Sequence, residues 1–156
     1  MHDPLSGRVI RAAVAVAVAA GTAVVAAVIA SPAAAATTTF SATADTYVQG
    51  STPTTNYGTS TQFVVDDSPV RRSFLKFTVS GLTAAVTNAK LRIHTISANS
   101  GSSNGGTWRS LTDTTWSETG TTWNNQPTID GPTLATLGSV ATSTWYEVDV
   151  TSLITG

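Results

Sequence analysis

Basic and aromatic side chains at alternating positions are the residues of this chain best suited to binding chemistry. Alternate residues of a β-strand point to the same face of a sheet. Guanidinium and ammonium groups on such a face would bind carboxylates, and an aromatic ring between them would stack on the CH groups of a sugar. The candidate ligand-binding residues are Arg72, Phe74, Lys76, Lys90, Arg92 and His94.

The basic residues are unevenly distributed along the chain. The 156 residues include eight Lys and Arg against nine Asp and Glu, which gives a formal net charge of −1. Most of the basic residues lie between positions 71 and 92. A nucleic-acid-binding protein would carry a general basic excess, so we predict no nucleic-acid partner. The local concentration remains compatible with an anionic ligand bound at one place.

A solvated strand face is the alternative interpretation, in which acidic side chains neutralise the basic ones. Like charges on neighbouring strands repel one another unless something compensates them. The candidate acidic partners are Asp66, Asp67, Glu147 and Asp149. Residue types alone leave both interpretations open.

Catalytic chemistry finds less support in the sequence. A glycosidase needs two carboxylates that face one bond, and the acidic residues show no spacing that pairs them. Arg92 and His94 would suit a polysaccharide lyase, which neutralises a uronate carboxylate and abstracts a proton. Such a lyase also needs a tyrosine beside a cation, whereas Tyr146 is followed by Glu147. We therefore predict no catalytic residues and keep a lyase as the less favoured alternative.

Metal ligands are also sparse in the sequence. His94 is the only histidine after residue 2, and a lone histidine makes a poor metal site. A calcium ion bound by Asp45, Asp66 or Asp149 would lack a dense loop of oxygen ligands. We predict neither a metal nor a cofactor.

Short β-strands are the elements that must position these residues. Segments rich in β-branched and aromatic residues alternate with turns rich in Gly, Pro and Asn, which predicts an all-β, antiparallel sandwich of jelly-roll type. The predicted strands are 39–48, 61–66, 72–80, 89–97, 107–113, 132–140 and 144–150. The short link 80–88 favours antiparallel pairing of 72–80 with 89–97. In that arrangement Leu75, Phe77 and Val79 face the core, and Phe74 faces outward.

The segment "TTWSETGTTWNNQP" carries two tryptophans, Trp116 and Trp123. Tryptophan usually packs against other residues. We interpret the pair as structural, closing one end of the sandwich, with Asn124, Asn125 and Pro127 fixing the turn. A sugar-binding tryptophan platform is the alternative. Trp108 and Trp145 are expected in the core or on a sheet face.

The N-terminal segment 1–36 has the pattern of a secretory signal peptide. Arg8 and Arg11 precede an uncharged apolar run at 12–30, and "SPAAAA" follows with small residues at an A-x-A site. A retained membrane helix is the competing interpretation, but no basic stop-transfer cluster follows. We predict cleavage after Ala36 and a secreted domain over 37–156 that is not held at a membrane. The chain has no cysteine, so the core must stabilise this domain without disulfides.

A series of motifs along the predicted domain resembles a known family. In order they are "ATADTYVQG", "TNYGTSTQFVVDD", "RRSFLKFTVSGL", "VTNAKLRIHT", "TTWSETGTTWNNQP" and "WYEVDVTSLI". This combination resembles the DNRLRE domain, also described as carbohydrate-binding module family 96. The name motif is only partly kept, because Lys90 replaces Arg and Ile93 stands where the family has Glu.

The resemblance implies a jelly-roll β-sandwich that binds polysaccharide without catalysis. Acidic polymers such as alginate are the implied ligands, and a polysaccharide-degrading enzyme is an implied partner. Family members continue past "DVTSLITG" with further strands, so we expect this sandwich to lack its last strands. A structural or adhesive spacer domain of a cell-surface protein is the alternative function.

Overall fold

The structure is a computed structural model that describes residues 36–96 and 104–154. In these ranges the chain is built from β-strands, as predicted, with two short 3-10 turns at Trp123–Asn125 and Thr151–Leu153. The strands are β1 (Ala42–Gln49), β2 (Asp66–Asp67), β3 (Val70–Phe77), β4 (Lys90–His94), β5 (Asn104–Arg109), β6 (Thr133–Ser139) and β7 (Trp145–Asp149).

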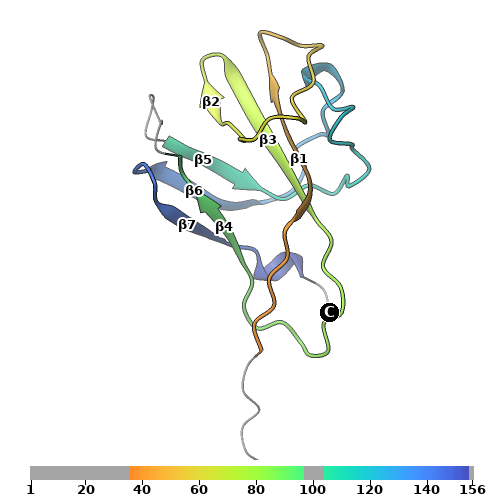
Figure 1. Cartoon of the computed structure of the whole chain (residues 1–156), viewed down its shortest axis with the longest axis vertical. Helices are drawn as coiled ribbons and strands as arrows, with labels where there is room; N and C mark the ends of the chain where they lie inside the picture. Colours follow the sequence, from red (N-terminus) through yellow and green to blue (C-terminus); the bar gives the residue numbers. More distant parts are fainter. Residues whose placement is uncertain (1–35, 97–103, 155–156) are drawn as a thin grey trace, which may run out of the picture. The chain divides into compact units, whose positions relative to one another are not determined.

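The strands pair antiparallel in three groups, ordered β1-β3-β2, β4-β7 and β5-β6 (Figure 1). This arrangement is consistent with the predicted all-β sandwich. The predicted signal peptide lies, except for its last residue, outside the described residues. Within the described ranges, no helix has the length and apolar character needed to cross a membrane.

The predicted pairing of 72–80 with 89–97 is wrong. β3 lies between β1 and β2, whereas β4 pairs with β7. The observed pairing is electrostatically favourable, because β4 carries Lys90 and Arg92 on one face and β7 places acidic residues directly opposite them. Pairing β4 with β3 would instead have placed cations of both strands on one face.

The main core lies on the face of β3 that carries Phe74. Val48, Phe74 and Trp116 form the buried cluster, and Trp123 packs against it. Phe74 is only 3% exposed, and its ring lies 6.0 Å from that of Trp116 between centroids. The prediction that Phe74 faces outward is therefore wrong, and its burial leaves no open ring face for a sugar.

The opposite face of β3 is more exposed than predicted. Phe77 at the end of β3 and Val79 just beyond it, both expected in the core, are 38% and 37% exposed. Alternation alone misassigned the faces because Arg72 and Lys76 share the core-facing side with Phe74. Each cation extends over a tryptophan ring at the edge of the core, at 4.8 Å from the ring centroid. Long basic side chains can line a core in this way while their charged ends stay near water.

Candidate functional site

The outer face of the β4–β7 pair carries three of the predicted ligand-binding residues. Lys90, Arg92 and His94 alternate with Leu91 and Ile93 as expected, and Ile93 is buried. Directly opposite them on β7 lie Asp149, Glu147 and Trp145. The Lys90 ammonium lies 3.0 Å from the Asp149 carboxylate, and the Arg92 guanidinium lies 3.3 Å from that of Glu147. The basic residues of β4 are thus neutralised by acidic residues of the protein, as the alternative interpretation expects.

Asp149 gives this face a measurable dependence on pH. Its carboxylate accepts hydrogen bonds from the Thr151 backbone N–H at 2.9 Å and from Lys90 at 3.0 Å. These bonds, that to the Thr151 backbone above all, lower the pKa of Asp149 from 3.8 to about 2. Because the folded pKa lies below the unfolded value, Asp149 stabilises the fold above pH 3.8 and loses this effect as the pH falls towards about 2.

We therefore expect the variant Asp149→Asn to lose less of its melting temperature than the wild type on acidification. Melting followed by circular dichroism between about pH 5 and about pH 2 measures this difference. Other carboxylates titrate equally in both proteins, so the difference isolates Asp149. Parallel melting curves at every pH would contradict the assignment.

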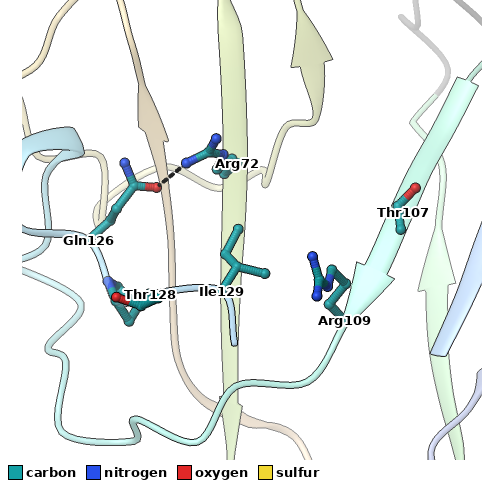
Figure 2. A pocket seen from close by; sticks show the side chains of 7 residues that line it. Arg72, Thr107, Arg109, Gln126, Thr128 and Ile129 are labelled. Carbon is teal, nitrogen blue, oxygen red and sulfur yellow. Dashed lines mark hydrogen bonds between the residues drawn. The ribbon is translucent and has the colours of Figure 1, made fainter. Parts of the chain in front are cut away.

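A second candidate site is a cavity of about 610 Å³ beside β3 and β5. Figure 2 shows its lining side chains, which come from these two strands and from the loop after the Trp123–Asn125 turn. The lining residues are Arg72, Thr107, Arg109, Gln126, Pro127, Thr128 and Ile129. We call this cavity the arginine groove.

Arg72 is held in the arginine groove by the Trp123–Asn125 turn. Its Nη1 donates to Gln126 Oε1 at 3.1 Å, and its guanidinium lies over the Trp123 ring. Asn125 fixes the turn by accepting from the Thr122 N–H at 2.6 Å and donating to the Gly120 carbonyl at 2.9 Å.

The structural interpretation of this tryptophan segment is confirmed for Trp116, which is buried in the core.

Arg109 enters the same groove from the end of β5. Its Nε and Nη2 both donate to the Gly131 carbonyl, at 3.1 and 2.8 Å. This bidentate anchor fixes the plane of the guanidinium and leaves its remaining N–H groups to other acceptors.

The lining of the arginine groove contains two arginines and no acidic residue. The carboxylate near it is that of Asp130, whose pKa is lowered by hydrogen bonds from Thr112 and also by Arg109. Among the described residues, Arg71, Lys90 and Arg92 form salt bridges to carboxylates. Lys76 donates to the carbonyls of Thr114 and Trp116 and does not line the groove. Arg72 and Arg109 form no salt bridge within the described part of the chain.

The six predicted ligand-binding residues therefore do not form one site. Arg72 lines the arginine groove. Phe74 lies in the core, and Lys76 lies at the edge of the core. Lys90, Arg92 and His94 lie on the β4–β7 face. The sequence prediction missed Arg109 because it stands alone outside the basic stretch, and it missed Trp145 as a neighbour of His94.

Two other features bear on the chemistry of these surfaces. Tyr146 lies on the opposite face of β7 from Glu147, and its hydroxyl accepts a hydrogen bond from the Ala141 N–H at 2.7 Å. His94 and Tyr146 are therefore not presented on one face, as a lyase would need.

In the described ranges, no group of three or more His, Asp or Glu could hold a metal ion.

Comparison with known proteins adds a family assignment. Residues 36–156 match the family model described as carbohydrate-binding module family 96. The curated proteins provide no match to the chain.

Proposed function

Because this chain belongs to carbohydrate-binding module family 96, we propose that it binds an acidic polysaccharide, a uronate polymer such as alginate, without changing it chemically. Membership of the family makes it a carbohydrate-binding module with a polysaccharide partner. The preference for uronates is supported by the arginine groove, which combines two arginines with no acidic lining residue.

The groove has groups that match a uronate unit. A cavity of about 610 Å³ falls within the range of about 300–1,000 Å³ usual for small-molecule sites. A guanidinium group pairs with a carboxylate through parallel N–H bonds. Thr107, Gln126 and Thr128 supply hydroxyl and amide groups that suit sugar hydroxyls.

Both arginines are partly fixed before a ligand arrives. Gln126 and Trp123 hold Arg72, and the Gly131 carbonyl holds Arg109. Fixing a side chain in advance lowers the entropy lost on binding. The groove is open to solvent, so its attraction for a carboxylate is weakened by salt.

We expect Arg109→Ala to weaken binding of alginate about tenfold at low salt. A hydrogen bond to a charged group contributes about 1.5–3 kcal/mol, and exposure of the groove places the loss at the lower end, near one decade. Titration calorimetry with alginate, pectate and a neutral glucan at low and high salt measures the effect. Arg109→Lys should recover only part of the affinity, because lysine keeps the positive charge but cannot donate two parallel hydrogen bonds to a carboxylate.

Arg71→Ala is the matched control for this experiment. Arg71 lies on β3 beside Arg72, pairs with Asp66 at 3.4 Å and does not line the groove. Its loss should change alginate affinity less than twofold. Equal losses of alginate affinity for both alanine variants would refute the groove as the uronate site. An affinity that does not change with salt concentration would also refute it.

Secretion and the absence of catalysis complete the proposal. The module would act outside the cell after removal of residues 1–36, beside a polysaccharide-degrading enzyme. The separation of His94 and Tyr146 onto opposite faces supports binding rather than lyase chemistry. A spacer domain would show no saturable binding in the same titrations.

A further inference from the structure

We propose that the outer face of the β4–β7 pair is a second carbohydrate-binding surface, on which Trp145 stacks against a neutral pyranose ring. The inference rests on the module binding polysaccharide, but not on the arginine groove or its preference for uronates. We call this surface the Trp145 face, formed by Lys90, Arg92, His94, Trp145, Glu147 and Asp149.

Trp145 is the most exposed large hydrophobic side chain in the described ranges, at 56% of its surface. The others that are exposed lie between 37% and 45%. Tryptophan gains more than any other residue from burial of its ring. Trp116, by contrast, is only 8% exposed. The fold therefore buries much less of Trp145 than of Trp116.

The neighbours of Trp145 hold its ring without enclosing it. The His94 ring lies opposite on β4 at 4.8 Å between centroids, tilted by 51°. The Arg92 guanidinium lies over the indole at 4.6 Å from its centroid, and it is itself held by Glu147. Although Arg92 and His94 both contact the indole, more than half of the residue stays exposed, so part of its surface is accessible to a ligand. A ring fixed in this way loses little entropy on binding.

The polar groups around the ring match the hydroxyl groups of a sugar. Arg92 donates, Glu147 accepts, and His94 can do either. A pyranose has CH groups on its ring faces and hydroxyls at its edge, so it would use both kinds of contact at once. An aromatic ring with both donors and acceptors beside it therefore suits a sugar better than it suits a purely apolar partner.

The charge of the Trp145 face favours a neutral sugar. Lys90 pairs with Asp149 and Arg92 with Glu147, so the cations are balanced and no guanidinium is left for a carboxylate. Because each carboxylate is paired with a cation, this face offers a uronate polymer no net electrostatic attraction. The Trp145 face and the arginine groove thus differ in the class of sugar residue that they accept.

The test is a titration of the purified protein with cellohexaose and xylohexaose, as neutral probes, and with an oligomer of alginate. NMR spectra report the indole N–H signal of Trp145, and calorimetry reports affinity at low and high salt. We expect the neutral probes to shift the Trp145 signal with little dependence on salt. Trp145→Ala should weaken their binding about five- to tenfold, whereas Trp145→Phe should keep part of it.

Arg109→Ala separates this inference from the proposed uronate site. We expect it to reduce alginate binding and to leave neutral binding unchanged, with Trp145→Ala showing the reverse pattern. No shift of the Trp145 signal by either neutral probe at millimolar concentration would overturn the inference. Equal effects of Arg109→Ala and Trp145→Ala on every ligand would also overturn it, since they would indicate one shared site. Leu153→Ala, at another exposed apolar residue, is the control and should change neither affinity.

Discussion

Replacing Phe74 by alanine is expected to lower the free energy of unfolding by about 3–5 kcal/mol. The phenyl ring is 3% exposed and packs in the cluster with Val48 and Trp116. Its removal loses the burial of the ring and leaves a cavity that neighbouring strands can only partly fill. Domains of this size are typically stable by about 5–15 kcal/mol, so the loss would be a large part of the total.

Phe77→Ala is the matched control, because it deletes the same ring from the end of the same strand. Phe77 is 38% exposed, and we expect its loss to cost about 1 kcal/mol. Urea unfolding followed by circular dichroism measures both variants. A larger loss for Phe77→Ala than for Phe74→Ala would place the core on the other side of β3. A sugar-stacking role of Phe74 would instead appear as lost binding with stability unchanged.

The sequence predicted β4 better than β3 for a physical reason. In β4 the apolar residues Leu91 and Ile93 alternate with charged ones, so alternation identifies the buried face. In β3 both faces contain aromatic residues, and two of its basic residues, Arg72 and Lys76, share a face with Phe74. Long-range contacts determine which face is buried, among them the tryptophans of a distant loop, which Arg72 and Lys76 overlie. Local alternation carries no information about these long-range contacts.

The candidate sites were predictable to different degrees. Three residues of the Trp145 face were identified from the alternation in 90–94, and their acidic partners were named among the alternatives. Trp145 could have been added from the same alternation, since it is in phase with Glu147 and Asp149. The arginine groove could not have been predicted in this way. It depends on Arg109, whose orientation is fixed by a backbone carbonyl across the β5–β6 pair.

The close approach of Gly131 to Ser110, the residue after β5, makes it a residue on which both stability and the arginine groove depend. Gly131 is buried, and a Cβ atom there would overlap the hydroxyl and the carbonyl group of Ser110. Backbone atoms cannot move aside as the end of a flexible side chain can. The Gly131 carbonyl also accepts both hydrogen bonds that orient Arg109.

Gly131→Ala is accordingly expected to lower the free energy of unfolding by about 3 kcal/mol, the upper end of the usual cost of overpacking. The folded fraction should also bind alginate more weakly, because displacement of residue 131 moves the Arg109 guanidinium. Gly138→Ala in β6 is the control, since a Cβ there meets no atom within 4 Å and should change stability by about 0.5 kcal/mol or less. Urea unfolding and alginate titration measure the two effects separately. Full stability of Gly131→Ala would show that the segments around Ser110 and Gly131 can move apart at this point. Full stability with weakened binding would then assign Gly131 to the orientation of Arg109 alone.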